Sequence, residues 1–242
     1  RTSETEKWTK MEGNTLTVDT NIQQTYYFKA INGKNLSGAE TAGYVVSIDK
    51  VVPLITLTPS VTETTNQSYD VNISVDAIGA SDVKCITLNG KDITGQGSFT
   101  VYENGAYVVK VESNSGLLTT ERIVIKNIDK NAPEITNIQI DAVNAGDYSG
   151  LGDGFGLFFK GGIKATISSK DTGVAGVDCM EYRLVDEDGN PLTQWTSYDV
   201  NDKPVVNSQF KGYVEARAID KAGNISDISR SEGFVVDLDN PT

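Results

Sequence analysis

A hydrophobic residue followed by Asp-x-x-x-Pro occurs three times in this chain, and this recurrence constrains the architecture more than any other feature. The three copies are Ile48–Pro53, Ile128–Pro133 and Val236–Pro241. The first two prolines precede similar sequences, Leu54-Ile55-Thr56 and Glu134-Ile135-Thr136. Internal repeats of this kind mark related structural modules joined in tandem. The boundaries predicted from the motif are 1–50 for a partial module, 51–131 for a complete module and 132–242 for a module with longer loops.

Short stretches in which apolar and polar residues alternate fill the chain between the prolines. Tyr69–Val75 alternates cleanly, and Asn89-Gly90 is a strong signal for a two-residue hairpin turn. About seven such stretches fit into the second module, the number expected for a β-sandwich. The strands expected in the third module are 135–140, 162–168, 179–185, 205–210, 213–219 and 233–236. The glycine-rich stretch 145–156 indicates a loop or a bulged edge. The predicted fold is all-β, with tandem immunoglobulin-like sandwiches.

Residues 1–49 are too few for a complete sandwich, but they align with the second half of the last module. Trp8-Thr9 matches Trp195-Thr196, 27–32 matches 215–220, and 44–49 matches 233–237 less closely. The strands that come earlier in the last module have no counterpart, and we expect a separate segment or a second molecule to supply them. The predicted core residues that need such a covering surface are Tyr26, Phe28, Ile31, Tyr44 and Val46.

Charge and composition exclude several classes of function. The chain has a net charge of −12 and contains no histidine. An acidic surface repels the phosphates of nucleic acids and anionic membranes. Without histidine, a Ser–His or Cys–His nucleophile cannot form, and the most common zinc ligand is missing. No apolar run reaches the roughly 18–20 residues of a membrane span. We therefore expect a segment that is not an enzyme, with neighbouring modules of the same polypeptide as its partners and no insertion into a membrane.

Two motifs resemble the bacterial Ig-like repeats of large cell-surface proteins of the Gram-positive type. The first is Ala218-Ile219-Asp220 with Gly223-Asn224-Ile225-Ser226, and the second is the turn Asp171–Val177. The resemblance implies an extracellular location at the bacterial cell surface or cell wall. It also implies a spacer or adhesive role, with a host or cell-wall glycan or protein as ligand. The alternative is a carbohydrate-binding accessory module of a secreted polysaccharide-active enzyme.

Calcium is the best small-ligand candidate, because it takes six to eight oxygen ligands from carboxylates and carbonyls. The aspartates predicted as its ligands lie at module junctions and are Asp129, Asp237 and Asp239, with Asp49 at the first junction. Further acidic residues in loops are Asp147, Asp153 and Asp171. The alternative is that the junction aspartates cap turns through their own backbone. No other cofactor is expected.

Carbohydrate binding would need exposed aromatic rings, and Trp195 with Tyr198 is the candidate pair. Because Trp8 repeats the position of Trp195, packing within the sandwich is the competing interpretation. Two further positions, Cys85 and Cys179, also look like one site in successive modules, and no disulfide between them is expected. Proline at each junction restricts its own φ and the residue before it, so we expect stiff connectors and modules arranged end to end.

Overall fold

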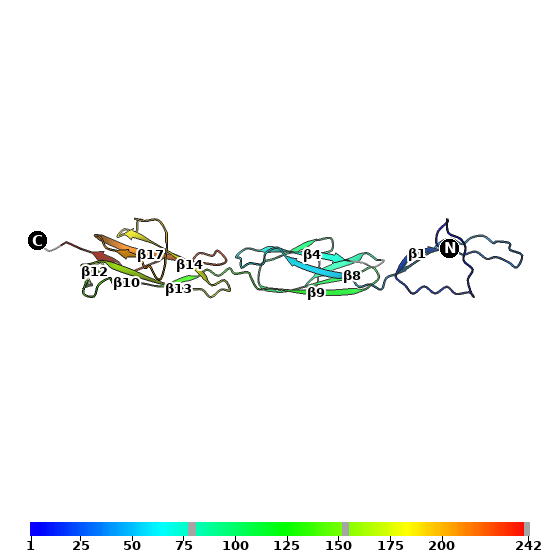
Figure 1. Ribbon diagram of the computed structural model, residues 1–242, viewed down its shortest axis with the longest axis horizontal. Coiled ribbons are helices and arrows are strands. Elements are labelled where there is room, and N and C mark those ends of the chain that lie inside the picture. Colours follow the sequence, from blue (N-terminus) through cyan, green and yellow to red (C-terminus); the bar gives the residue numbers. More distant parts are fainter. Residues whose placement is uncertain (77–80, 152–154, 240–242) are drawn as a thin grey trace. The chain divides into compact units, whose positions relative to one another are not determined.

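The computed structural model describes residues 1–76, 81–151 and 155–239, and strands are its regular secondary structure (Figure 1). Within these ranges no helix is long and apolar enough to cross a membrane. The chain forms two compact units. The N-terminal unit comprises 1–60, 69–101 and 105–125, and the C-terminal unit comprises 61–68, 102–104 and 126–242.

The N-terminal unit contains one complete sandwich of two antiparallel sheets. One sheet has the order β3 (Leu54–Pro59), β4 (Tyr69–Asp76) and β7 (Ser98–Val101). The other has the order β6 (Lys91–Asp92), β5 (Val83–Leu88), β8 (Gly105–Ser113) and β9 (Leu118–Ile125). Alternate residues of β4 and β8 face the core, where Val71, Val109 and Val111 are fully buried. The predicted hairpin at Asn89-Gly90 is confirmed, since both residues have positive φ and connect β5 to β6.

The same unit also contains a two-stranded sheet, β1 (Ile22–Tyr26) paired with β2 (Tyr44–Ile48). Of the predicted core residues of this part, Ile31 and Tyr44 are 56% and 60% exposed, and Tyr26, Phe28 and Val46 are half-buried. The edge of the Phe28 ring contacts Tyr44, with ring centroids 6.0 Å apart. Residues 1–50 thus have paired strands but no buried core.

The C-terminal unit contains a second sandwich with a larger sheet. Its small sheet has the order β10 (Glu134–Ala142), β13 (Ile163–Lys170) and β16 (Val205–Val206). Its large sheet has the order β11 (Tyr148–Leu151), β12 (Leu157–Phe159), β19 (Phe234–Val236), β17 (Phe210–Asp220), β14 (Val177–Asp186) and β15 (Thr196–Ser197), and β18 (Ser229–Arg230) pairs with β17. The fully buried Phe234, Ile163 and Val214 lie in the core between the sheets.

The structure confirms the predicted all-β fold of tandem immunoglobulin-like sandwiches. In the glycine-rich stretch, β11 pairs antiparallel with β12 at a sheet edge, and the bulge between Tyr148 and Gly150 is the irregular edge that was expected. One predicted strand was wrong: 205–210 divides into β16 and the start of β17, which belong to different sheets. Within 205–210 the chain crosses from the small sheet to the large sheet, so no single face of this stretch stays buried.

Candidate metal centre

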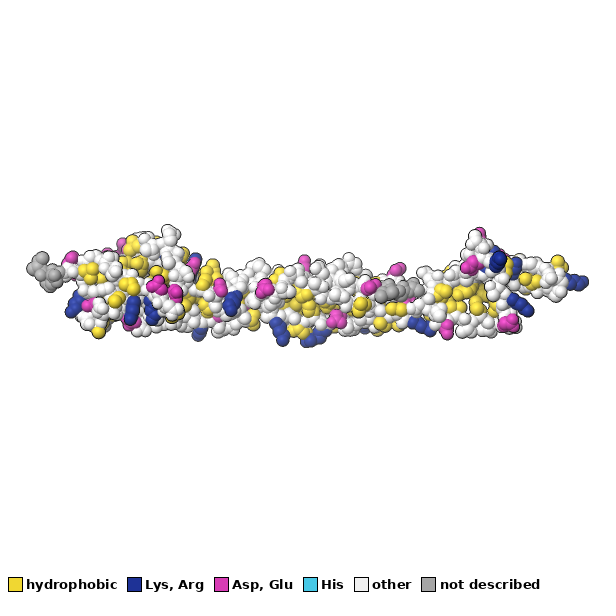
Figure 2. Space-filling view, viewed as in Figure 1, with side chains coloured by type: hydrophobic (Ala, Val, Ile, Leu, Met, Phe, Trp, Pro, Cys, Tyr) yellow, Lys and Arg dark blue, Asp and Glu magenta, His cyan; other side chains and the backbone are white. Residues whose placement is uncertain are grey.

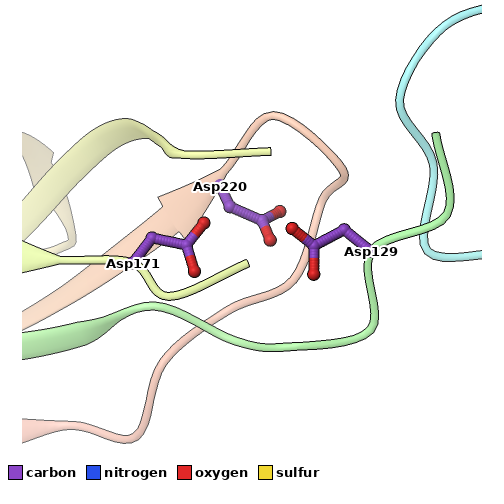
Figure 3. Close-up of side chains that lie close together, drawn as sticks. All are labelled: Asp129, Asp171 and Asp220. Carbon is purple, nitrogen blue, oxygen red and sulfur yellow. The ribbon is translucent and has the colours of Figure 1, made fainter. Parts of the chain in front are cut away.

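Three aspartates of the C-terminal unit converge at one end of the second sandwich (Figure 3). Asp129 lies in the connector before β10, Asp171 directly follows β13, and Asp220 is the last residue of β17. Each offers a carboxylate oxygen, and these oxygens all lie within 4.8 Å of one another. We call Asp129, Asp171 and Asp220 the acidic triad.

The turn after β17 holds Asp220 in place. Gly223 has a φ of 88°, which lets the chain reverse there, and Asp220 accepts hydrogen bonds from the backbone N and the side-chain Nδ2 of Asn224, both at 2.7 Å. The same Nδ2 lies 3.0 Å from the carbonyl oxygen of Asp129. The Gly-Asn pair of the sequence motif therefore positions one member of the triad and contacts the backbone of another.

Asp129 is held by three segments of the same unit. Its backbone N donates to the carbonyl oxygen of Thr65 at 2.8 Å, and its carboxylate accepts from the backbone N of Asn131 at 2.9 Å and of Ala175 at 2.7 Å. Gly173 packs against this carboxylate so closely that a Cβ atom there would lie 2.1 Å from Oδ2. The loop after β13 must therefore have glycine at this position for Asp129 to keep its place.

Like charges at short distance dominate the electrostatics of the triad. Asp129 and Asp220 are each only 2% exposed. Two carboxylates about 4.8 Å apart repel by roughly 3 kcal/mol at an effective dielectric constant of about 20. None of the ion pairs formed by the described residues includes a member of the triad. The protein thus brings three carboxylates together without supplying a basic side chain to neutralise them.

One oxygen of the triad has no hydrogen-bond partner. Asp171 accepts a hydrogen bond from the backbone N of Gly173 through Oδ1 at 2.8 Å, but its Oδ2 is buried and unpartnered. A buried acceptor left without a partner costs about 1–3 kcal/mol, and more when it is charged. Carboxylate oxygens with nearby carbonyl and amide oxygens are the donors that Ca²⁺ prefers. The donor set of the triad fits a hard divalent cation.

The equivalent end of the first sandwich carries hydroxyl groups instead. Val83 and Val177 pair with Ser113 and Asp220 at matching strand bulges, so Ser113 occupies the position of Asp220. Asp49, the counterpart of Asp129, accepts hydrogen bonds from the hydroxyls of Ser81 and Ser115. Hydrogen bonds from Ser81, from the backbone N of Val51 and from Ser115 hold the pKa of Asp49 below its ordinary value. This carboxylate is therefore satisfied without a cation.

One of the three calcium ligands predicted from sequence lies in the triad. Asp129 belongs to the triad, whereas Asp237 and Asp239 are exposed and share the side-chain amide of Gln209 at 3.2 and 2.7 Å. Asp237 and Asp239 lie at the opposite end of the module from Asp129, so they are not part of the triad, and calcium binding at the junction aspartates stays a prediction.

The loop aspartates have different outcomes. Asp171 is in the triad, Asp147 accepts a hydrogen bond from Asn144 at 3.1 Å, and Asp153 lies outside the described residues. Asp220 was not among the predicted ligands. Its signal was the Asp-Lys-Ala-Gly-Asn sequence, which sequence reasoning used only as evidence for the fold.

The predicted aromatic pair does not form a platform for a sugar. Tyr198 is 8% exposed and its hydroxyl accepts a hydrogen bond from the backbone N of Ile167 at 3.2 Å, so this residue belongs to the core. Trp195 is contacted by the guanidinium groups of Arg183 and Arg217, at 4.6 and 4.5 Å from the ring centroid. The packing interpretation of Trp195 accounts for these contacts.

The two arginines are themselves fixed by carboxylates. Arg183 pairs with Glu215 at 2.7 Å, and Arg217 pairs with Glu181 at 2.6 Å. Burial raises the pKa of Glu215, but hydrogen bonds from Arg230 and Arg183 outweigh it and leave the pKa below its ordinary value. Glu215 is therefore an ionised anchor for the cations that cover the tryptophan.

Replacing Trp195 with alanine should destabilise the second sandwich by about 1–2 kcal/mol, because two cation–π contacts of about 0.5–1 kcal/mol each are lost. Urea denaturation followed by circular dichroism measures the change. A glycan array should show no saturable binding by the wild-type chain that depends on this residue. Unchanged stability together with loss of glycan binding would restore the sugar-binding interpretation.

Comparison with known proteins gives structural likeness only. No protein-family model matches the sequence, and no curated protein matches it. The fibronectin(III)-like modules of CbhA from Clostridium thermocellum are 12% identical with a TM-score of 0.34, over 78% of this chain and 98% of theirs. A group of titin domains is 13% identical with a TM-score of 0.45, over 88% of this chain and 75% of theirs. The BSP domain of a biofilm-associated protein is 15% identical with a TM-score of 0.20, over 76% of this chain and 30% of its own. The fold assignment rests on the strand order given above.

Proposed function

We propose that this chain is a non-catalytic spacer segment of a secreted or cell-surface bacterial protein. The observation that carries the proposal is the connector between β9 and β10, which is hydrogen-bonded along its length. Ile128 exchanges two hydrogen bonds with the side chain of Asn104, at 2.7 and 2.9 Å, and Asn127 donates to the carbonyl oxygen of Glu63 at 2.8 Å. Together with the Asp129–Thr65 bond, these contacts make a short connector with few free backbone groups, which suits a spacer.

Charge and the repeat resemblance support an extracellular location for this segment. A net charge of −12 favours a well-solvated surface, and tandem sandwiches that end in Asp-x-x-x-Pro resemble the modules of bacterial surface proteins. Neighbouring modules of the same polypeptide are the expected partners, and an adhesive contact to a protein or glycan is a further expected role. The alternative function, a carbohydrate-binding module, would have to work without Tyr198, because this residue is buried.

A second candidate function is cation binding at the acidic triad, favoured by the buried, unpartnered Oδ2 of Asp171. Asp129 belongs to the connector, while Asp171 and Asp220 belong to the second sandwich. A Ca²⁺ ion shared by the three would therefore fasten the connector to the sandwich. The spacer would then be stiffest where calcium is abundant, as it is outside cells.

Small-angle X-ray scattering tests the spacer proposal. A compact globule of 242 residues has a radius of gyration of about 18 Å. We expect a value well above this, because a spacer has to hold its sandwiches apart. Replacing Pro133 and its neighbours Asn131 and Ala132 by glycine should broaden the distance distribution without unfolding either sandwich. A compact wild-type particle would contradict the spacer function.

A further inference from the structure

The small β1–β2 sheet repeats the strand register of the second sandwich. Ile22 pairs with Ile48 in the small sheet, as Phe210 pairs with Val236 in the second sandwich. The same correspondence continues beyond the strands, where Ile31 bridges Ser37 as Ile219 bridges Ile225. The residues 22–49 therefore correspond to 210–237 one for one, with no gap.

Arg1 extends the correspondence to a third strand. The backbone N of Tyr27 donates to the carbonyl oxygen of Arg1 at 3.0 Å, and the amino group of Arg1 donates to the carbonyl oxygen of Tyr27 at 3.3 Å. Arg183 of β14 faces Glu215 of β17 in the same way. Arg1 thus stands beside β1 where Arg183 stands beside β17.

The cations around the first tryptophan follow the same pattern. The guanidinium of Arg1 lies 4.7 Å from the ring centroid of Trp8, and the ammonium of Lys29 lies 4.3 Å from it. Lys29 corresponds to Arg217 in the register given above. Trp8 therefore has the environment of Trp195, with one cation from each of the two corresponding positions.

What differs is the surface that covers these strands. In the second sandwich the small sheet covers β17 and β19, β12 runs parallel to β19, and Phe234 is completely buried. The corresponding Val46 is only half-buried, and no residue between 1 and 50 is buried. Figure 2 shows hydrophobic side chains gathered on the surface of this N-terminal part. Large apolar side chains here that are more than 40% exposed are Leu16, Ile31, Leu36, Tyr44 and Val45.

We infer that residues 1–50 form the acceptor half of a further sandwich. The occupant it fits is a β-segment with the strand pattern of residues 134–182, with its last strand in line with Arg1. Such a segment supplies a small sheet to cover Tyr26, Phe28 and Val46, a strand parallel to β2, and a strand that pairs with β1. A second copy of the chain fits less well, because its own 134–182 segment is already paired within its second sandwich.

A chimera tests the inference directly. One additional copy of residues 134–182 is fused to the amino group of Arg1, and the 242-residue chain that follows is left unchanged. The position of Arg1 predicts that this junction brings every inward residue of the added strands into register. Amide hydrogen exchange in β1 and β2 should then slow by at least about 100-fold relative to the original chain, because these strands gain a covered core.

The matched control is the same chimera with one glycine inserted before Arg1. A shift of one residue turns the inward face of a strand outward, so this control should show little protection of β1 and β2. In a Trp8→Phe background, the fluorescence of Trp195 reports that the second sandwich remains folded. Unprotected β1 and β2 in the in-register chimera, or equal protection in both chimeras, would overturn the inference.

Discussion

Calcium should raise the midpoint of thermal unfolding of the second sandwich by on the order of 10 °C when its free concentration is about 100 times the dissociation constant. Binding to the folded state alone then stabilises by about 2.7 kcal/mol. Each kcal/mol shifts the midpoint of a domain of this size by about 4 °C. The physical source of the gain is the acidic triad, where a divalent cation replaces mutual repulsion by attraction and gives Oδ2 of Asp171 a partner.

Scanning calorimetry in excess calcium and in excess chelator measures this shift. Replacing Asp171 with asparagine should have two opposite effects. The midpoint in chelator should rise, because one of three neighbouring like charges is removed. The gain on adding calcium should largely disappear, because a charged ligand is lost.

The chain offers two matched controls for the calcium experiment. Asp237→Asn changes an exposed junction aspartate outside the triad, and Asp49→Asn changes the counterpart of Asp129 at the hydroxyl-lined site. Both variants should keep the full calcium response. Identical midpoints with and without calcium, or a response that survives Asp171→Asn but not Asp237→Asn, would remove the triad as a cation site.

Local patterns predicted the fold well because β-sandwich signals are themselves local. The alternation in Tyr69–Val75 and the Asn89-Gly90 turn each depend on a few adjacent residues, and the structure has the predicted strand and hairpin there. The strand predicted at 205–210 failed where the chain crosses between sheets. Val206 and Phe210 pack into the core from two different layers, whereas Val205 is exposed, and periodicity along the chain does not show a change of layer.

The acidic triad could not be assembled from sequence because its members come from three separate segments. Asp129, Asp237 and Asp239 share a repeated motif, and that similarity suggested a shared role. In the fold, only Asp129 meets the loop after β13 and the turn after β17. Asp237 instead accepts a hydrogen bond from Gln209. A repeated motif identifies equivalent positions, but the side chains that complete a site depend on which loops surround each copy.

The aromatic pair illustrates a related point, since its contacts agree with the packing interpretation. Sequence shows that Trp195 and Tyr198 are near one another, but not which way each ring faces. Because Trp195 precedes the short strand β15 and Tyr198 follows it, one ring lies over the arginines of β14 and β17 and the other enters the core. The repeat of tryptophan at position 8 was the better guide, since it indicated a structural role.

Replacing Phe234 with alanine should cost the second sandwich about 3–5 kcal/mol, the range for removing a large buried side chain. Phe234 is 0% exposed, and its ring stacks on Phe210 with centroids 4.8 Å apart. Trp8→Phe leaves Trp195 as the single tryptophan, so its fluorescence follows the unfolding of this sandwich in urea. Phe234→Leu keeps most of the side-chain volume and should lower the free energy of unfolding much less. This variant should remain folded even if the alanine variant does not fold.

Val46 in residues 1–50 corresponds to Phe234 and provides the control. If strand register alone determined burial, truncating either side chain would lower the free energy of unfolding to a similar degree. Val46 has the place of Phe234 but lies on a face without a covering sheet, so Val46→Ala should change stability by at most about 0.5 kcal/mol. Trp8 fluorescence in a Trp195→Phe background reports on this region. In the in-register chimera the cost of Val46→Ala should rise to about 1 kcal/mol or more, because the side chain is then buried. A large cost in the original chain would mean that residues 1–50 already have a core of their own.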